Sequence, residues 1–261
     1  MYVLYKGPSV IDGGPIVVIA SGYINPSKNA KTGPMIQVYI LRADMLPTEA
    51  IKENLDESIC GDCIHRNGSC YVQVFRAPNQ IYKSWQKKNP TPLTKAEIRL
   101  VGKNRAIRLG AYGDPGAAPT WVWENLTRNA RGYTGYTHLW KTCDPKLKNY
   151  CMASADSIEE AAHAQSEGWR TYRVKELHEQ NTPLEISCPH SEIVKCETCL
   201  LCKGVSNGKN ITIDIHGANW KQQRFSSAIR ARKDLVILNA NESREMPVHF
   251  ISTKRAESTA A

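Results

Sequence analysis

Short runs of apolar and β-branched residues alternate along the chain with polar segments rich in glycine, asparagine and lysine. Residues 15–20 (PIVVIA) and 35–42 (MIQVYILR) are two such runs, and a polar loop from 22 to 33 separates them. Runs of this length and composition, bounded by turn residues, are typical of strands. The pattern predicts a pair of strands with a long connection, followed by a helix from 44 to 56 that has Pro47 near its first turn.

A regular alternation of strands and helices begins after the first hundred residues. Strands are expected at 106–114, 132–140, 150–156, 169–174 and 184–187. Helices are expected between two pairs of them, from 118 to 130 and from 158 to 167, the second capped by Ser157 and ended by Gly168. Strands that alternate with helices favour parallel pairing. The expected fold class is therefore α/β, with parallel strand–helix units that form a partial or full barrel similar to a TIM barrel.

The C-terminal part of the sequence has a different composition. A closing strand is expected from 210 to 217, and a helix with a basic face follows from 221 to 234. The basic side chains of that helix are Lys221, Arg224, Arg230, Arg232 and Lys233. From Glu242 onward polar residues dominate, which predicts a frayed tail. We expect residues 1–187 to form the barrel-like domain and residues 188–261 to form a small cysteine-rich, metal-binding extension with a basic C-terminal segment.

Composition narrows the class of protein and of partner. Of the 261 residues, 41 % are hydrophobic and 23 % are charged, and the formal net charge is +9. This is ordinary globular composition, and the positive charge favours nucleic acid or a nucleotide as partner, the alternative being a basic protein without such a partner. No apolar window reaches about 18 residues and no basic leader precedes one, so we expect a cytoplasmic protein without a membrane partner.

Three common enzyme signatures are missing from the sequence. There is no Gly-x4-Gly-Lys-Ser/Thr phosphate-binding loop, no Gly-x-Gly-x-x-Gly dinucleotide fingerprint and no Gly-x-Ser-x-Gly nucleophile elbow. The sequence therefore argues against a nucleoside triphosphatase, a Rossmann dehydrogenase and a serine hydrolase.

The strongest chemical signal is a late group of metal-ligand residues. Cys188, Cys196, Cys199, Cys202 and His216 fall within 29 residues. Two successive Cys-x2-Cys steps let neighbouring thiolates turn toward one centre, as in zinc ribbons and cluster-binding loops. Zinc would suit the last three cysteines with His216, whereas a 4Fe–4S cluster would suit the same three with Cys188. The sequence leaves both open.

An early group, Cys60-x2-Cys63-x6-Cys70, repeats the signal, with His65 between its last two members. The chain has nine cysteines, and an odd number in a reducing compartment is a poor basis for a disulfide framework. Metal ligation accounts for seven of the nine, and Cys143 stands outside both groups. We therefore expect one early and one late cysteine-ligated centre.

Polar residues at the ends of the expected strands are the candidate catalytic residues. Asp114, His138 and Asp156 each lie at or just after a strand, where the loops of parallel sheets converge on the ligand site. Asp114 follows Gly113, so its backbone could approach a ligand closely. Each has a plainer reading: Asp114 as a turn residue, His138 as a half-buried histidine bonded to a carbonyl, and Asp156 as a carboxylate at a helix start.

The order of these features resembles that of the radical S-adenosylmethionine enzymes. The resemblance implies that Cys60, Cys63 and Cys70 hold a 4Fe–4S cluster whose fourth iron site binds the methionyl group of S-adenosylmethionine. It also implies that the strand end at Gly113 and Asp114 contacts the methionine amine, and that the four late cysteines hold an auxiliary cluster. The family spacing is Cys-x3-Cys-x2-Cys, whereas this chain has Cys-x2-Cys-x6-Cys.

The sequence is also similar to small cysteine-rich proteins encoded by bacteriophages and related mobile elements. The shared features are the early cysteines, the Gly-Asp strand end, a strand rich in tyrosine and threonine, and the closing Cys-x2-Cys-x2-Cys. This likeness implies a phage origin and the host cytoplasm as location, and it implies no particular activity.

Three functions remain open at this point. The first is an iron–sulfur enzyme that cleaves S-adenosylmethionine and acts on a nucleotide or nucleic acid, with Asp114 at the cofactor and His138 and Asp156 near the substrate. The second is a zinc-stapled, non-catalytic nucleic-acid-binding protein. Its base-stacking side chains would be Tyr133, Tyr136, Trp140 and Trp169. The third is a base-modifying enzyme of the tRNA transglycosylase kind, with a parallel barrel, strand-end carboxylates and a late Zn²⁺ site.

Overall fold

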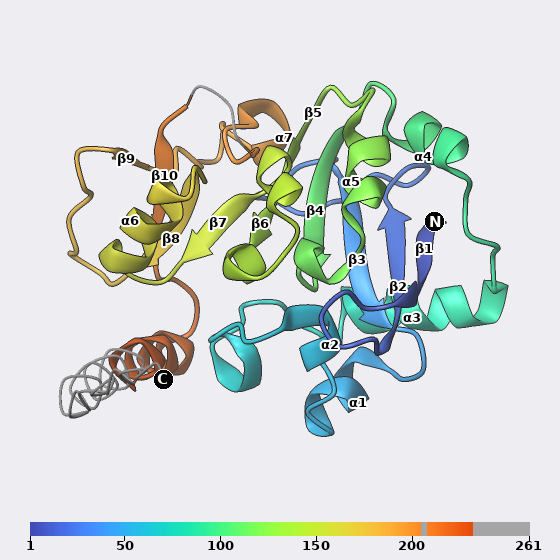
Figure 1. Cartoon of the computed structure of the whole chain (residues 1–261), viewed down its shortest axis with the longest axis horizontal. Helices are drawn as coiled ribbons and strands as arrows, with labels where there is room; N and C mark the ends of the chain where they lie inside the picture. Colours follow the sequence, from blue (N-terminus) through green and yellow to red (C-terminus); the bar gives the residue numbers. More distant parts are fainter. Residues whose placement is uncertain (205–207, 232–261) are drawn as a thin grey trace, which may run out of the picture.

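Two five-stranded sheets form the framework of the computed structural model, which describes residues 1–204 and 208–231 (Figure 1). The first sheet has the order β1 (Tyr2–Pro8), β2 (Pro15–Ser21), β3 (Ile36–Arg42), β4 (Ala106–Tyr112) and β5 (Gly132–Thr134). The second has the order β6 (Tyr136–Thr137), β7 (Met152–Ala155), β8 (Thr171–Lys175), β10 (Asn210–Asp214) and β9 (Glu185–Ser187).

The first sheet begins with antiparallel strands and carries most of the apolar core. β1, β2 and β3 pair antiparallel, which confirms the expected strand pair and adds β1, which the sequence analysis had not identified. Both faces of β2 and β3 are covered, since Ile16 to Ile19 and Ile36 to Leu41 are almost all fully buried. This explains their continuous apolar runs, because a strand covered on both faces needs no polar alternation.

A run of parallel strands connects the two sheets. β3, β4 and β5 pair in parallel, and so do β6, β7, β8 and β10. Only Gly135 separates β5 from β6, and a β-carbon there would lie 2.8 Å from the sulfur of Cys151. The chain therefore turns from one sheet into the other at a residue that has no side chain. The expected α/β class with parallel strand–helix elements is confirmed.

The helices agree with expectation in part. They are α1 (Pro47–Lys52), α2 (Glu57–Cys60), α3 (Ala77–Lys88), α4 (Lys95–Gly102), α5 (Thr120–Thr127), α6 (Ile158–Ser166) and α7 (Cys196–Cys199). Short 3-10 turns lie at Arg66–Gly68, Pro115–Ala117, Leu139–Lys141 and Pro145–Asn149. The helix expected from 44 to 56 is shorter in the structure. It is α1, which ends at Lys52, because Asn54 shortly after it takes a left-handed conformation with φ 58°. α5 and α6 occupy the expected places, whereas α3 and α4 were not expected.

One expected strand is shorter than its sequence suggested. The segment 132–140 ends as a strand at Thr137, and His138 begins a 3-10 turn. The reason is a hydrogen bond of 2.7 Å from the backbone N–H of His138 to the carboxylate of Asp114, which takes the place of a strand partner. Trp140 in this turn and Trp169 before β8 are both buried, so neither ring is presented at the surface for stacking on a base.

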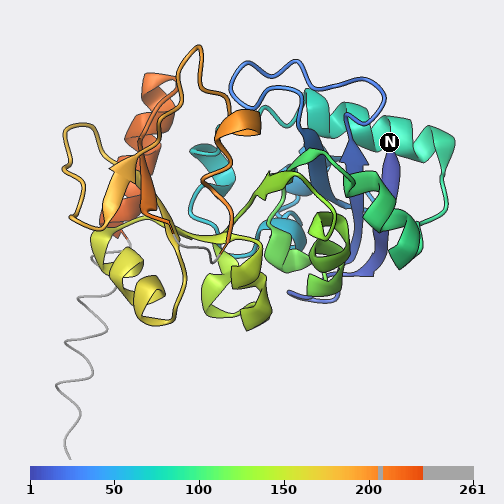
Figure 2. The ribbon, with the colours of Figure 1, turned by 90° about the horizontal axis from the view of Figure 1, so that it is seen from above.

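The cysteine-bearing segments lie apart from the helices that follow the strands. Figure 2 shows α5 and α6 on one side of the strands and the segment with the early cysteines on the other. In Figure 1 that segment lies below the ends of β3, β4 and β7, close to a C-terminal helical segment described over 219–231. The arrangement leaves the carboxyl ends of the parallel strands facing the early cysteines.

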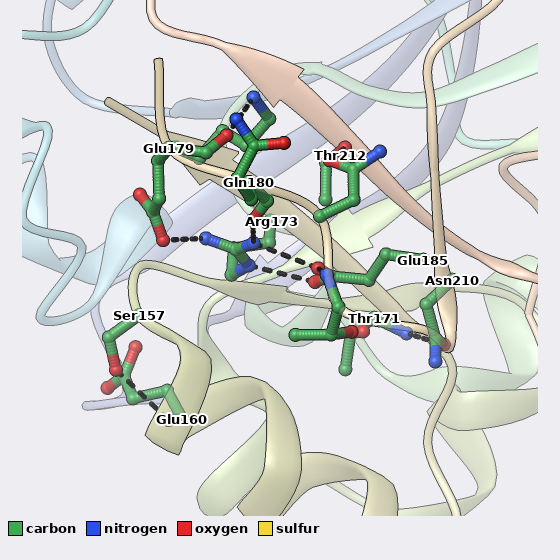
Figure 3. A network of polar contacts seen from close by, with 12 residues as sticks. Ser157, Glu160, Thr171, Arg173, Glu179, Gln180, Glu185, Asn210 and Thr212 are labelled. Atoms are coloured by element: carbon green, nitrogen blue, oxygen red, sulfur yellow. Dashed lines mark hydrogen bonds and ion pairs between the residues drawn. The ribbon is translucent and has the colours of Figure 1, made fainter. Parts of the chain in front are cut away.

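The second sheet contains a buried ion network in place of a purely apolar layer. Arg173 in β8 is fully buried and forms two hydrogen bonds of 2.8 Å with the carboxylate of Glu185 in β9 (Figure 3). It also pairs with Glu179 at 2.5 Å. Two-point pairing of a guanidinium with a carboxylate fixes geometry as well as charge. The network therefore holds the edge strand that leads to Cys188.

The C-terminal part of the chain returns to the second sheet. β10 lies between β8 and β9 in that sheet, so the residues after the expected boundary at 187 and 188 still contribute to it. That boundary stays a prediction. Arg232 and Lys233 of the expected basic face, and the expected tail from Glu242, lie outside the described residues. Within residues 1–204 and 208–231, no helix is long and apolar enough to span a bilayer.

Candidate functional site

A cavity of about 360 Å³ opens at the carboxyl ends of the parallel strands. Consecutive strands contribute side chains to its wall: Arg108 from β4, Tyr136 from β6, Ser154 from β7, Tyr172 from β8 and Ile213 from β10. Loops at the carboxyl ends of parallel strands commonly form ligand sites, and a volume of a few hundred cubic ångströms suits a small molecule. The cavity is therefore the candidate functional site.

The early cysteines Cys60, Cys63 and Cys70 all line this cavity. Cys60 ends α2, and the next residue, Gly61, has φ 57° at a place where a β-carbon would also collide with Leu139. Burial raises the pKa of the Cys60 and Cys70 thiols, and the charge of Cys63 raises both further. In the opposite direction, the nearby charges of Lys221 and His138 lower the pKa of Cys70. A bound metal would favour the thiolate form of all three residues.

Charged side chains form hydrogen bonds with both ends of the loop that carries these cysteines. Arg66 forms an ion pair of 2.9 Å with buried Asp56 and donates a hydrogen bond of 2.8 Å to the carbonyl of Gly61. Lys221, in the C-terminal helical segment, donates a hydrogen bond of 2.6 Å to the carbonyl of Cys70. The loop geometry therefore depends on charged contacts from distant parts of the chain.

Two histidines and a carboxylate meet beside the early cysteines. Oδ1 of Asp156 lies 3.7 Å from Nε2 of His65 and 3.6 Å from Nε2 of His138. Among the described residues, this is the only set in which three potential ligand atoms all lie within 4.8 Å of one another. His65 and Asp156 come from the cysteine loop and the end of β7, and His138 comes from the end of β6. The arrangement could hold a divalent metal ion.

The surroundings orient the two imidazoles. Nδ1 of His65 is 2.9 Å from the hydroxyl of Ser69, and its ring stacks on Phe225 at 5.4 Å. Burial by itself would lower the pKa of His138, but the charges of Cys63 and Asp156 raise it well above the usual value. Burial would likewise raise the pKa of Asp156, but the two histidines hold it below its usual range. Nε2 of His138 is buried and has no hydrogen bond of normal length within the described chain.

Asp114 lines the cavity, but its carboxylate oxygens already accept hydrogen bonds from within the protein. It accepts hydrogen bonds of 2.8 Å from the N–H of Gly116, 2.6 Å from the hydroxyl of Thr137 and 2.7 Å from the N–H of His138. Burial raises its pKa, and these hydrogen bonds oppose the rise. Gly113 before it has φ 80°. Asp114 therefore positions His138, as well as standing where the sequence analysis expected a ligand-facing residue.

The late cysteines gather at a second, much smaller cavity of about 20 Å³. Its walls include Cys188, Cys196, Cys199 and Cys202. Burial first, and then the charges of the other three late thiols, raises the pKa of Cys202 to about 12. The backbone N–H of Cys196 donates to the carbonyl of Lys31 at 3.0 Å, which ties α7 to the long loop between β2 and β3. The expected late group is thus assembled in space.

His216 is not among the residues that line the small cavity of the late thiols. It follows β10 by two residues, lines the large cavity and has its ring 6.3 Å from that of Tyr71. Its Nδ1 is 3.0 Å from the carbonyl of Asp214. The structure therefore brings Cys188 to the other late cysteines and leaves His216 beside the early part of the chain.

The spacing of the thiols bears on which metal they suit. In neither cysteine group, within the part of the chain that is described, do three sulfur atoms lie within 4.8 Å of one another. Tetrahedral zinc, with bonds of about 2.3 Å to sulfur, places its thiolates about 3.8 Å apart. An iron–sulfur cubane separates them further, because each thiolate binds its own iron. Among the described residues, neither group therefore has three sulfur atoms at the spacing of a tetrahedral zinc site.

Two residues of the cavity were missed as functional candidates in the sequence. His65 was noted only as an interruption of the cysteine spacing, although it is the third member of the set with His138 and Asp156. Arg108 was treated as part of an apolar strand, although its guanidinium lines the cavity. A histidine within a cysteine loop and a charge in an apolar strand are the signals that could have identified them.

Comparisons of the chain with protein-family models, with curated proteins and with solved structures found no match.

Proposed function

We propose that the chain is an iron–sulfur enzyme of the radical S-adenosylmethionine type and that its reaction takes place in the large cavity. Cys60, Cys63 and Cys70 would hold a 4Fe–4S cluster there. The observation that carries the proposal is that these three cysteines line one cavity at the carboxyl ends of a series of parallel strands. Three thiolates leave one iron of such a cluster open to an exogenous ligand.

The strand order supports this proposal. β3, β4 and β5 are parallel in the first sheet, and β6, β7, β8 and β10 are parallel in the second, and we propose that the two runs together form a partial barrel. The early cysteine loop follows the first of these strands, and Gly113-Asp114 follows the second. The resemblance to the radical S-adenosylmethionine enzymes implies the same order of strands and cysteines. This agreement is in topology and does not depend on the cysteine spacing.

The protein residues around the cavity would have distinct tasks. A bound cluster would supply the single electron that cleaves the sulfonium of S-adenosylmethionine. Arg66 and Lys221 hold the cluster loop, and Asp114 holds the turn that places His138. His138 is the group placed to hold or release a proton at Nε2, and Asp156 orients its ring. Apolar residues dominate the cavity wall and limit the access of water.

The late group would hold a second centre. Its four cysteines, including Cys188, match the ligand number of a 4Fe–4S cluster, with Zn²⁺ as the alternative. The net charge of +9 supports a nucleotide or nucleic acid as substrate.

Cleavage of S-adenosylmethionine by the anaerobic protein tests the proposal. With dithionite as reductant, one electron and one hydrogen atom convert the cofactor to methionine and 5′-deoxyadenosine, which chromatography measures. We expect both products from the wild type and from Cys143→Ser, a control cysteine outside both groups. We expect neither product from Cys63→Ser. Equal cleavage by Cys63→Ser and the wild type would reject the proposal.

A second candidate function rests on the His65, His138 and Asp156 set. Two histidines and one carboxylate on a single divalent metal leave open coordination positions, as in non-haem iron and hydrolytic zinc sites. In that case the purified protein would carry a metal without sulfide, and Asp156→Asn would lose it. If the iron–sulfur proposal holds, Asp156→Asn keeps its iron and sulfide and Cys63→Ser does not.

A further inference from the structure

Arg108 differs from the other well-covered arginines in what it contacts. Arg42, Arg66 and Arg173 each pair with a carboxylate, of Asp44, Asp56 and Glu185 respectively. Arg170 donates to backbone carbonyls of Leu201, Lys203 and Lys209. Arg108 makes a single hydrogen bond within the described chain, of 2.5 Å to the hydroxyl of Tyr71, and pairs with no carboxylate there.

Arg108 faces the cavity, whose wall also includes Lys31. Arg108 lies on β4, partly buried, and its side chain forms part of the cavity wall. A guanidinium stays charged at all relevant pH values, and removing it from bulk water without an anion is unfavourable. Its remaining N–H groups form a planar fork that matches a carboxylate or a phosphate. Among the described residues, Arg108 therefore has no carboxylate partner, and the nearby groups that can carry a negative charge are the Tyr71 and Tyr136 hydroxyls and the Cys196 thiol.

The wall near Arg108 includes aromatic and apolar side chains, together with Thr134 directly opposite it on β5. Tyr136 and Tyr172 contact each other with ring centroids 4.3 Å apart, and Ile213 lies on the neighbouring strand. The nearby acidic group is the thiol of Cys196, whose pKa burial raises and Arg108 lowers. Aromatic walls accept the flat face of a ring, and the arginine accepts an anionic group attached to it. The wall therefore selects a planar ligand that carries an oxyanion.

We infer that Arg108, with Tyr71, binds the oxyanion of the substrate, and that the substrate is a mononucleotide or a similar aromatic phosphate or carboxylate. The inference rests on the proposed function only in taking this cavity as the reaction site. A cavity of about 360 Å³ suits a small molecule rather than a folded polymer, so a small molecule is favoured over a nucleic acid chain.

Calorimetric titration with a charged and an uncharged probe of the same ring tests this inference. The probes are guanosine 5′-monophosphate and guanosine, with adenosine 5′-monophosphate, adenosine and benzoate as further arms that separate base, phosphate and carboxylate. For the wild type we expect a nucleotide to bind about tenfold more tightly than its nucleoside. Arg108→Met should abolish this preference while nucleoside binding persists. Arg128→Met, which removes an exposed positive charge on the helix side, should keep it.

A conservative variant guards against loss of fold. Arg108→Lys retains the charge and loses the fork, so its preference should lie between those of the wild type and Arg108→Met. Equal binding of nucleotide and nucleoside by the wild type, absence of binding of every probe, or an unchanged preference in Arg108→Met would each overturn the inference. So would a loss of affinity in Arg108→Met that is confined to S-adenosylmethionine, because Arg108 would then serve the cofactor.

The titration separates this inference from the proposed function. Binding is measured without reductant, so it does not depend on cleavage of S-adenosylmethionine. A nucleotide preference that needs Arg108, in a protein that never cleaves S-adenosylmethionine, would reject the proposed function and keep the binding site. Cleavage without any nucleotide preference would do the reverse.

Discussion

The two cysteine groups have the same chemistry in different surroundings. The early group has three thiols on a cavity of about 360 Å³, whereas the late group has four around a cavity of about 20 Å³. A space of the smaller size admits little more than one water molecule. The early thiols therefore border a space that would admit a ligand beside a bound metal, whereas the small cavity of the late thiols would not. Of the late group, Cys196 also lines the large cavity. Ligand type alone does not separate a reactive centre from a structural or auxiliary one; the space around it does.

The two groups also differ in how they are assembled. Cys196, Cys199 and Cys202 are brought together by local spacing around α7. The early site needs His138 and Asp156, which come from the ends of two later strands, and Phe225 and Lys221 from the C-terminal helical segment. The early site thus depends on the tertiary fold. We therefore expect substitutions of the late cysteines to reduce stability more than function, and substitutions of the early cysteines to reduce function more than stability.

Cys199→Ser should have the largest effect on stability. Removing one late ligand releases the centre that ties α7 to the long loop through Cys196 and Lys31. Loss of a structural metal centre costs about 4 kcal/mol or more, which is roughly 10 °C in the melting temperature of a chain this size. Thermal unfolding followed by circular dichroism measures the shift. A melting temperature within about 2 °C of the wild type would show that the late centre stabilises nothing.

Glu185→Gln should cost about 3 kcal/mol, because it leaves Arg173 buried without its two-point partner. Burial alone would raise the pKa of Glu185, but its hydrogen bonds with Arg173 hold that pKa below the usual value. The stabilisation is therefore complete above the ordinary glutamate pKa and is lost as pH falls through the lower folded-state pKa. Urea unfolding at several pH values measures it. We expect the gap between wild type and variant to narrow in acid, and a gap that widens would contradict the assignment.

Phe225→Ala should act on the early group more than on the late one. The Phe225 ring is 1 % exposed and stacks on His65, so its removal costs about 3 kcal/mol of local packing. In metal-free protein we expect a thiol reagent to modify Cys70 faster, while Cys199 keeps its rate as the internal control. Peptide mass spectrometry resolves the two sites. An equal acceleration at both would show a general loosening of the protein.

Cys63→Ser should have the smallest effect on stability and the largest on function. Cys63 is only partly buried at the cavity wall, so the variant should unfold within about 1 kcal/mol of the wild type in urea. It should nevertheless lose the metal of the early centre. If Cys63→Ser instead unfolds the whole protein, the early group is a structural staple and the contrast between the two groups disappears.

Local sequence patterns identified much of the first sheet and of the metal chemistry. The apolar runs around Val17 and Val38 marked β2 and β3, because a strand buried on both faces has to be apolar throughout. The cysteine spacings marked both thiol groups. α4 was missed although Thr94 and Glu97 form a capping box at its start, a local signal present in the sequence.

Other features depend on contacts that no local pattern encodes. The turn at His138 follows from a hydrogen bond to Asp114, 24 residues earlier. The meeting of His65 with Asp156 requires that the cysteine loop fold back across the ends of the strands. The choice of Cys188 over His216 as the companion of the late thiols likewise follows from where β10 enters the sheet.

The iron and acid-labile sulfide content of protein purified without oxygen decides whether the early cysteines hold an iron–sulfur cluster. We expect about eight irons with matching sulfide per wild-type chain, and about four in Cys63→Ser and in Cys199→Ser. The Cys63→Ser sample should retain only the late centre. Zinc without sulfide in the wild type, or an iron and sulfide content unchanged by Cys63→Ser, would contradict a cluster at the early cysteines.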